Sequence, residues 1–563
     1  MQKTTTLQEV LSLPTSSGKA LGLFGLYKNI DEILEQFSKS YQEVKEETKH
    51  EKTNLRKHLG AYYTHPEIAE KIVADTLCGF NDKDLTSLKF YEPCVGLGIF
   101  VYKFLDYIFS VRNIEKKYLQ LVLDNLYFSD IDHKAVDLVA TILPIYVKQK
   151  YGMDVKFNQN NTYKGDVLFK KENGIQKNNP LKIFNLHDGF DVVITNPPYR
   201  LLKANSNKYE QKDETAEIVN FIKKNKVYKY NEGTLNLYKL FVEEIIENYT
   251  HQKSSIGLLI PQTILNDLQS ERLRKKILEY KLSTIFIIPE QNKYFPDITQ
   301  SFCFFSINKG IVGQNLINLV SEVISKENIN SKPIAVDLEL LKSVSSNLPI
   351  FSESRIGWNI LKKLQKAPKL NTHLGIKNLR GELDLTLHKS YISNTPASFK
   401  LVRGSNIKEY ELKSTEDYVE EKFLNIANGK GKYIKMERLA GQQISNISSK
   451  KRLKFAKVPP NYILGNSCNF IVVETNLFKN AIIDIDYLLL ILNSFLLDWR
   501  FKLTSSNNHV NNYALADLPI HVPNGAEIKK LHSLRNKRTE LEDYILSMYG
   551  LEKEEREYIL NKY

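Results

Sequence analysis

The chain has 563 residues, which is too long for one ordinary domain and indicates two to four domains. Hydrophobic residues make up 42% and charged residues 25%, a balance that argues against wholesale disorder. The 78 lysine and arginine residues outnumber the 65 aspartate and glutamate residues, giving a formal net charge of +13. This charge favours a polyanionic partner, because basic side chains neutralise phosphates and release counterions.

The four cysteines lie far apart and form no CxxC pair, which excludes a zinc ribbon or a disulfide framework and fits a reducing cytoplasm. The first 14 residues lack the apolar core of a secretory signal. The most apolar stretch, residues 482–499, is interrupted by Asp484, Asp486 and Asn493, so it predicts a buried amphipathic helix and not a membrane span. We therefore expect a cytoplasmic protein without a metal site or a membrane contact.

Residues 1–57 have the mixed charge pattern of an exposed helical leader. From residue 58 to residue 310, short apolar runs rich in β-branched residues alternate with helical periods. This alternation predicts a parallel or mixed sheet with helices on both faces. The expected strands are residues 88–91, 126–129, 192–195, 255–260, 284–288 and 302–307, and the expected helices are residues 101–109, 134–148, 237–248 and 270–280.

Two polar insertions, residues 170–188 and 201–234, interrupt this domain, and long irregular segments inside a domain are usually functional or disordered. The pattern changes after residue 310. We expect a connection over residues 311–350, a region of short strands over residues 351–525 and a charged helix or helix pair over residues 526–563.

A glycine turn follows the first expected strand, in the run Glu92-Pro93-Cys94-Val95-Gly96-Leu97-Gly98. Gly96 and Gly98 allow the backbone to approach a ligand closely. A dinucleotide fingerprint would need a third glycine where Val101 stands, so a pyrophosphate cofactor is disfavoured. A tight turn that binds no ligand is the alternative.

Acidic residues follow the next expected strand and, further along the chain, a short irregular run. Asp130 is placed to accept hydrogen bonds from two ribose hydroxyls, whereas Asp132 is expected to cap the following helix. Asp166, in Gly165-Asp166-Val167, is a candidate acceptor for the exocyclic amine of an adenine moiety. A turn aspartate that bonds its own backbone is the alternative for Asp166.

The expected strand at residues 192–195 ends abruptly at Asn196-Pro197-Pro198-Tyr199, and two prolines force the chain out of the sheet at its carboxyl edge. Ligands of open α/β sheets bind at this edge. The side-chain oxygen of Asn196 and the carbonyl oxygen of Pro197 form a pair of acceptors that suits an amino group with two N–H donors. Tyr199 adds an aromatic face that can stack on a planar base.

In their order along the chain, these segments resemble the γ-class amino-type DNA methyltransferases of restriction–modification systems, which methylate adenine N6 with S-adenosylmethionine. The resemblance covers residues 58–310 and weakens beyond them. It implies an α/β fold, with a Rossmann-like S-adenosylmethionine methyltransferase domain built on a mixed seven-stranded sheet and a C-terminal α+β target-recognition domain at residues 351–525. It also implies a site-specific enzyme that acts on an adenine flipped out of double-stranded DNA.

The resemblance assigns roles to individual residues, although His65 stands where the family has a proline. The residues matched to the cofactor's methionine are Tyr63, Thr64, Glu92, Gly96 and Gly98. Those matched to its ribose and adenine are Asp130, Ile131 and Asp166. Those matched to the target base are Asn196 and Pro197 as acceptors and Tyr199 and Phe295 as stacking rings.

Basic and amide-rich runs are candidates for DNA contact. Lysines of the second polar insertion either contact phosphates or form a solvated basic loop, and they include Lys203, Lys208, Lys223 and Lys224. The run at residues 506–513 either reads bases or satisfies its own backbone, and its candidates are Asn507, Asn508, His509 and Asn511. Trp499 is expected in the core of this region.

Three alternatives stay open. A single-chain restriction–modification enzyme would need a nuclease domain of roughly 100 residues or more, for which the leader at residues 1–57 is too short. The same acceptor pair would suit cytosine N4 or a glutamine amide, although the basic C-terminal half favours nucleic acid. A non-catalytic DNA-binding protein is disfavoured by the intact run at residues 196–199. A cognate restriction endonuclease is an implied partner, whereas the recognised DNA site and the oligomeric state are not predicted.

Overall fold

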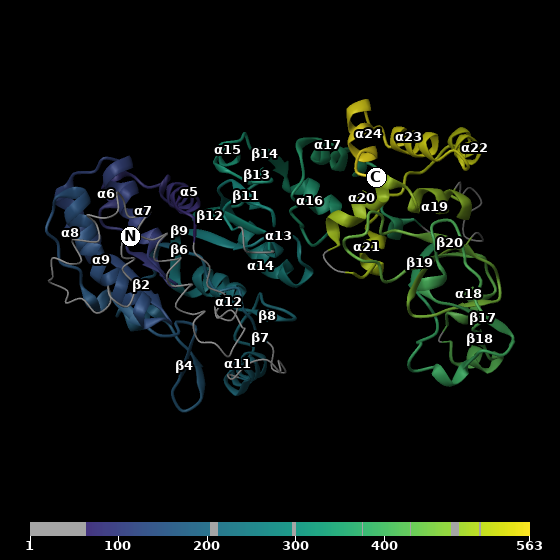
Figure 1. The fold of residues 1–563 in the computed structure, drawn as a ribbon, viewed down its shortest axis with the longest axis horizontal. Coiled ribbons are helices and arrows are strands. Elements are labelled where there is room, and N and C mark those ends of the chain that lie inside the picture. The colour runs from purple at the N-terminus through teal and green to yellow at the C-terminus, as the bar shows by residue number, and fades with distance from the viewer. Residues whose placement is uncertain are drawn as a thin grey trace, which may run out of the picture. The chain divides into compact units, whose positions relative to one another are not determined.

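The computed structural model describes residues 64–202, 212–295, 300–373, 375–427, 429–474, 483–505 and 508–563 (Figure 1). The chain divides into two compact units, Met1–Leu338 and Glu339–Tyr563. This division falls inside the segment expected as a connection, residues 311–350. The expected leader and the candidates Tyr63, Lys203, Lys208 and Asn507 lie outside the described residues.

A mixed sheet forms the centre of the first unit. Its strands are β1 (Phe90–Glu92), β2 (Leu126–Asp130), β3 (Thr162–Lys164), β6 (Phe190–Thr195), β9 (Thr250–Pro261), β10 (Tyr280–Leu282), β11 (Ile285–Ile288), β12 (Phe302–Val312), β13 (Leu316–Val320) and β14 (Ile334–Asp337). They are ordered β14-β13-β11-β12-β9-β6-β1-β2-β3, and β10 pairs with β12. From β3 to β9 the neighbours are parallel, whereas β12 is antiparallel to both β9 and β11.

The mixed sheet expected from the sequence is confirmed, and each of the six expected strands overlaps an observed strand. Within the described residues the sheet has ten strands and not seven. The additional strands are β13 and β14, which extend the sheet beyond β11, and β10 beside β12. The segment expected as a connection thus contributes two strands to the sheet.

Helices cover the strands of this sheet. The four expected helices are observed as α7 (Ile99–Asp106), α9 (His133–Tyr151), α12 (Leu237–Glu244) and α14 (Glu271–Leu278). Shorter or additional helices are α5 (Pro66–Leu77), α6 (Asp82–Leu85), α8 (Leu119–Asp124), α13 (Thr263–Asn266) and α15 (Lys326–Ile329). α5 packs on β9 and β12, and α9 packs on β2 and β3. Because β6 is covered on both faces, its run Val192-Val193-Ile194 is apolar throughout and 0% exposed.

The strand order reverses at β1, with β2 and β3 on one side and β6 and β9 on the other. Glu92 is the last residue of β1, and Thr195 is the last residue of β6. In open α/β sheets the carboxyl ends of strands at such a reversal are where ligands bind. The fold therefore brings the glycine turn and the Asn-Pro-Pro-Tyr run to the same edge of the sheet.

The two polar insertions fold into small elements of their own. The first contains the hairpin of β4 (Phe169–Lys171) and β5 (Ile175–Lys177) and the short helix α10 (Pro180–Ile183). The second contains β7 (Leu201–Leu202) and α11 (Lys212–Asn225). An ion pair of 3.1 Å between Lys171 and Glu217 joins the hairpin to α11. β7 pairs with β8 (Leu235–Asn236), so the chain beyond Tyr199 returns to the start of α12.

The second unit contains two four-stranded sheets, which fits the expected α+β region. One sheet has the order β15-β22-β19-β20 and the other the order β16-β18-β17-β21. Their strands are β15 (Ile376–Arg380), β16 (Ile392–Ser393), β17 (Phe399–Val402), β18 (Tyr418–Val419), β19 (Arg438–Gln442), β20 (Phe455–Val458), β21 (Tyr462–Leu464) and β22 (Cys468–Val473). The helices beside them are α16 (Leu338–Val344), α17 (Arg355–Leu364), α18 (Gly431–Ile434) and α21 (Asn512–Ala516).

The apolar stretch at residues 482–499 does not form the single helix that its composition predicts. It contributes to two helices, α19 (Ile485–Leu492) and α20 (Phe495–Thr504), which are separated at Asn493 and Ser494. The side chain of Ser494 accepts a hydrogen bond from Leu497 N–H and caps α20. Trp499 is 3% exposed, which confirms its place in the core. Across the described ranges, no helix is long and apolar enough to cross a bilayer.

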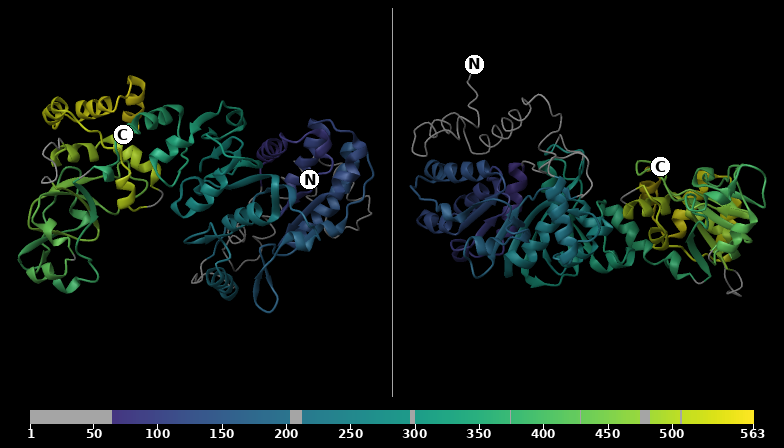
Figure 2. Two further views of the ribbon diagram at one scale, coloured as in Figure 1. Left: turned by 180° about the vertical axis from the view of Figure 1, so that it is seen from behind. Right: turned by 90° about the horizontal axis from the view of Figure 1, so that it is seen from below.

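The end of the chain forms three short helices where the sequence predicts one or two. They are α22 (Gly525–Leu534), α23 (Arg538–Met548) and α24 (Lys553–Leu560), drawn in yellow in Figure 2. Gly550, with a φ of 73°, lies between α23 and α24 and supplies the left-handed conformation that ends a helix.

Candidate active site

Asn196 lies directly beyond β6, and both the nitrogen and the oxygen of its side-chain amide form hydrogen bonds. Its Nδ2 donates to Thr64 Oγ1 at 3.0 Å, and its Oδ1 accepts from the Tyr199 hydroxyl. The same hydroxyl lies 2.9 Å from the Leu259 carbonyl oxygen, so its one proton serves two acceptors. An amide oxygen has two lone pairs, and each can accept a hydrogen bond. Thr64 therefore links the segment before α5 to the Asn-Pro-Pro-Tyr run.

The ring of Tyr199 is fixed by two other aromatic side chains. Its centroid lies 5.4 Å from that of Phe302, and the ring of Tyr238 meets it edge-on at 6.2 Å. Tyr238 is 1% exposed and stands at the start of α12, where the Asn236 side chain accepts from its N–H at 3.4 Å. The supporting role of Phe302 has no local sequence signal, because it arises from the pairing of β12 with β9.

The two glycines of the turn differ in their surroundings, because Gly98 packs against α9 and Gly96 does not. Gly98 has a φ of 80°, and a Cβ there would lie 2.9 Å from Val139 Cγ2 of α9. Gly96 has a φ of 50°, and apart from its chain neighbours no atom of a described residue lies within 4 Å of the position that its Cβ would take. Asp130 Oδ2 accepts from Gly96 N–H at 2.9 Å, which ties the end of β2 to the turn.

Glu92 ends β1 beside this turn and is 1% exposed. Its Oε2 atom has no hydrogen-bond partner among the described residues. Burial, reinforced by the neighbouring Asp130 carboxylate, raises the pKa of Glu92 well above its ordinary value. A buried carboxylate oxygen without a partner is costly, so this atom fits a role in binding a cationic ligand group.

Asp130 and Ile131 face different surroundings at the end of β2. Burial raises the pKa of the Asp130 carboxyl, although the backbone N–H groups of Asp132 and Gly96 oppose this shift. Ile131 is 62% exposed, which leaves an apolar side chain uncovered next to the acid. Asp132 accepts from Lys134 N–H at 3.0 Å and caps α9, as the sequence predicts.

Asp166 takes part in the turn that the sequence offered as an alternative to ligand binding. Its Oδ1 accepts from Leu168 N–H at 2.8 Å and from Phe169 N–H at 3.2 Å. A role of Asp166 toward an adenine amine stays a prediction.

Phe295 is part of the same aromatic group as Tyr199 but is buried, with 4% of its surface exposed. Its ring centroid lies 4.8 Å from that of Phe302, which in turn contacts Tyr199. Its N–H donates to Asn292 Oδ1 at 2.7 Å. Phe302 thus lies between the rings of Phe295 and Tyr199, and stacking of Phe295 on a base stays a prediction.

The DNA-contact candidates that are described lie in both units. Lys223 and Lys224 are exposed near the end of α11, and neither forms an ion pair with a described residue. Asn508 uses its side-chain oxygen to accept from Ile447 N–H at 2.8 Å, which bonds it to another segment and not to the backbone of its own run. Asn511 donates to the Tyr513 hydroxyl at 3.3 Å, and His509 forms a β-bridge with Ile444. Among the residues described, no three His, Cys, Asp or Glu side chains are grouped to hold a metal ion.

Two family models match the chain. Residues 124–295 match the model described as Eco57I restriction-modification methylase, and residues 399–520 match the model described as TaqI-like C-terminal specificity domain. These matches confirm the resemblance of the chain to the restriction–modification DNA methyltransferases. The methylase match contains Asp130, Asp166, the run at residues 196–199 and Phe295, and the specificity match contains Asn508 and His509.

Solved structures of restriction–modification enzymes are similar to this chain at low identity. The type IIG restriction endonuclease BpuSI is 13% identical, with a TM-score of 0.43, over 90% of this chain and 66% of that one. MmeI in complex with DNA is 12% identical, with a TM-score of 0.49, over 90% and 77%. The DrdV–DNA complex is 12% identical, with a TM-score of 0.49, over 90% and 59%. This chain therefore spans about two thirds of the length of BpuSI and less of DrdV. No curated protein sequence matches the chain.

Proposed function

We propose that the protein transfers a methyl group from S-adenosylmethionine to the N6 amine of an adenine flipped out of double-stranded DNA, at a specific sequence. The observation that carries the proposal is the position of Asn196, which follows β6 at the carboxyl edge of the sheet and has its amide oriented by Thr64 and Tyr199. The methylase and specificity matches support DNA as the substrate.

The ends of β1 and β2 fit S-adenosylmethionine. When bound, this cofactor supplies an electrophilic methyl group on a sulfonium. Glu92 Oε2, which has no hydrogen-bond partner among the described residues, suits its ammonium group, and Asp130 suits its ribose hydroxyls. The exposed Ile131 offers an apolar surface to the adenine ring, and the open side of Gly96 leaves room for the methionine part.

The amine of adenine is a weak nucleophile, because its lone pair is delocalised into the ring. Hydrogen bonds from its two N–H groups to Asn196 Oδ1 and to the Pro197 carbonyl would localise the lone pair on nitrogen. Since the sulfonium methyl is already electrophilic, positioning and preorganised acceptors matter more than a strong base. Thr64 then acts as a positioning residue, because it fixes which atom of the Asn196 amide points away from it.

The target base must leave the duplex before these acceptors can reach it. Flipping costs on the order of a few kcal/mol. Stacking on an aromatic ring offsets about 1–3 kcal/mol of this cost. Tyr199 suits this role because Phe302 and Tyr238 already hold its ring, so stacking requires little further ordering.

We infer that such an enzyme acts in the cytoplasm and protects host DNA from a cognate restriction endonuclease. Sequencing with methylation detection tests the proposal on DNA from methylation-deficient cells that express the protein. We expect N6-methyladenine in one sequence context. Methylation of cytosine N4 would change the target base, and specific cleavage by the purified protein with Mg²⁺ would add a nuclease. DNA without any new modification would contradict the proposal.

A further inference from the structure

Two segments of the second unit, residues 443–450 and 508–510, pair with each other, and we call them the paired loops. Three hydrogen bonds join them, each of 2.8 Å: Val510 N–H to the Gln443 carbonyl, Ser445 N–H to the Asn508 carbonyl, and Ile447 N–H to Asn508 Oδ1. Because these bonds lie within the protein, the shape of the paired loops does not depend on a ligand.

The buried side chain of Arg452 supports the paired loops. It is 1% exposed, and its guanidinium donates to the Ser445 carbonyl at 3.3 Å and to Ser505 Oγ at 2.8 Å. Arg452 thus connects the first of the paired loops to Ser505, which lies just before the second. The backbone N–H groups of Arg452 and Leu453 donate to Asp498 Oδ1 at 2.7 and 2.6 Å.

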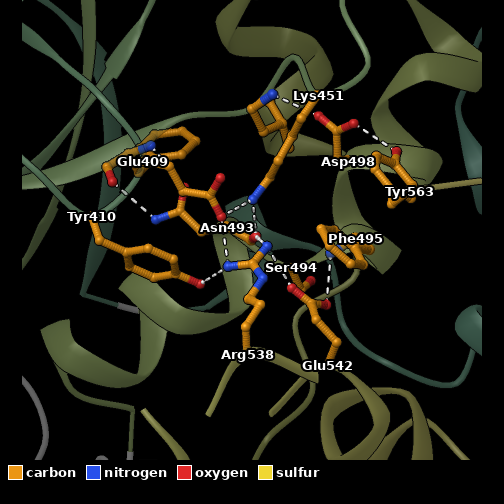
Figure 3. A network of polar contacts seen from close by, with 12 residues as sticks. Glu409, Tyr410, Lys451, Asn493, Ser494, Phe495, Asp498, Arg538, Glu542 and Tyr563 are labelled. Carbon is orange, nitrogen blue, oxygen red and sulfur yellow. Dashed lines mark hydrogen bonds and ion pairs between the residues drawn. The ribbon is translucent and has the colours of Figure 1, made fainter. Parts of the chain in front are cut away.

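Asp498 belongs to a buried polar network that supports the paired loops (Figure 3). It is 0% exposed, and its Oδ2 accepts from the Tyr563 hydroxyl at 2.6 Å. Lys451, next to Arg452, donates to Glu409 and to the Asn493 carbonyl. Lys451, Arg452 and Asp498 each bond more than one partner, so the network helps to hold the loops in one conformation.

Two large apolar side chains project from this support into solvent. Ile444 is 59% exposed and Ile447 is 52% exposed. The amide groups beside them are those of Gln443 and the exposed Asn446, and the exposed Arg380 donates to Gln443 Oε1 at 3.4 Å. Single exposed apolar residues are common on proteins, but two isoleucines on one rigid loop among amides and a cation are typical of a binding surface.

We propose that Ile444 and Ile447 contact thymine methyl groups in the major groove and so help to determine the recognised sequence. This inference rests on the proposed function, since it assigns DNA as the occupant. The cations Arg380 and Lys450 at the paired loops and the net charge of +13 suit a phosphate-rich duplex and not a neutral protein face.

An A·T base pair presents groups in the major groove that suit both the amide and the isoleucine side chains of the paired loops. In the major groove, adenine presents an acceptor and a donor that pair with an amide such as that of Gln443. Thymine presents a methyl group, the only apolar group on a base edge of this groove, which packs on an aliphatic side chain. The paired loops carry both, so they suit a site with an A·T pair besides the target adenine.

The experiment measures binding to duplexes in which deoxyuridine replaces thymine, which removes only the methyl group. The preferred sequence is first selected from random duplexes by binding, a step that needs no methyl transfer. Each thymine is then replaced in turn, and the affinity is measured for the wild type, an Ile444→Ala/Ile447→Ala double variant and the control Val522→Ala. Val522 is 51% exposed in the same unit and lies outside the paired loops.

At one or two positions we expect the uridine duplex to bind the wild type and the control about fourfold more weakly per missing methyl. The double variant should bind thymine and uridine duplexes equally, with an unchanged dependence on salt. Equal wild-type binding to every uridine duplex, an undiminished uridine effect in the double variant, or no preferred sequence would overturn the inference. A uridine effect that follows the isoleucines in a protein that methylates nothing would support the inference and contradict only the proposed function.

Discussion

Asn196 is held by one residue that lies beside it in the sequence and by one that does not. Tyr199 is three residues away, and the prolines between them remove backbone donors, so a cluster of acceptors near an aromatic ring could be predicted locally. Thr64 lies 132 residues earlier, and its bond to Asn196 depends on how α5 packs on the sheet. The sequence could therefore predict the reactive groups but not the contact that orients them.

Replacing Asn196 separates catalysis from cofactor binding. Asn196→Ala removes one of the two acceptors for the target amine, and we expect kcat to fall roughly 100-fold or more. The affinity for S-adenosylmethionine, measured by calorimetry, should change little, because Glu92 and Asp130 lie on other strands. Thr64→Val is the matched variant: it keeps the amide but removes its anchor, so we expect a smaller loss, about tenfold, in kcat. Wild-type turnover by Asn196→Ala would contradict the acceptor role.

We expect Glu92 to make the binding of S-adenosylmethionine dependent on pH. Its pKa is raised by burial and by Asp130, and only the ionised carboxylate attracts an ammonium group. Affinity for S-adenosylmethionine should therefore rise as pH rises through this raised pKa. Glu92→Gln, which cannot ionise, should bind more weakly and with a flatter pH profile. Titration calorimetry at several pH values checks this, and parallel profiles for the two proteins would remove Glu92 from the cofactor site.

At the scale of elements, prediction succeeded where the pattern is local. The runs that became β1, β2, β6, β9, β11 and β12 are short, β-branched and bounded by turns, so their period is visible in the sequence. The break between α19 and α20 is different. Asn493 bonds the backbone N–H and carbonyl of Phe455, each at 2.9 Å, across 38 residues. Only the tertiary fold supplies this contact, so hydrophobicity alone predicts one helix.

The buried polar network in Figure 3 joins α23 to α20 and contains ionisable side chains. Glu542 of α23 is 0% exposed, accepts from Phe495 N–H at 2.9 Å and pairs with Arg538 at 2.7 Å. Burial raises the pKa of Glu542 to about 7 and lowers that of Lys451 to about 8.

A raised carboxyl pKa means that the folded protein binds more protons than the unfolded chain between about pH 4.5 and 7. The contribution of Glu542 to stability is therefore fully present below pH 4.5 and is lost as pH rises through 7. Glu542→Gln keeps the size of the side chain but removes this proton. We expect the difference in the free energy of unfolding between variant and wild type to shift in favour of the variant from pH 5 to pH 8, measured by urea unfolding. A constant difference would contradict a titrating Glu542.

At the scale of the whole molecule, the net charge of +13 predicts that DNA affinity falls steeply with salt. Composition gives this charge directly, but it does not say which lysines meet phosphate. The structure separates them, because Lys170 is paired with Glu172, whereas Lys223 and Lys224 have no ion pair with a described residue.

Neutralising the α11 lysines should reduce this salt dependence. In Lys223→Ala/Lys224→Ala, the slope of log affinity against log salt should fall by about 0.9 for each phosphate that the protein no longer neutralises. Lys170→Ala is the control and should change the slope less, since Glu172 already neutralises that charge. Fluorescence anisotropy with one duplex at several salt concentrations gives all three slopes. A slope that stays the same in the double variant would mean that α11 does not contact the DNA backbone.

The central claim is that a pair of oxygen acceptors at the end of β6 presents adenine N6 to a sulfonium methyl. The most direct measurement is mass spectrometry of nucleosides after the purified protein reacts with duplex DNA and S-adenosylmethionine carrying an isotopically labelled methyl group. The label should appear in N6-methyladenine with the wild type, and roughly 100-fold or more slowly with Asn196→Ala. Label found only in cytosine, or in no nucleoside at all, would contradict the claim.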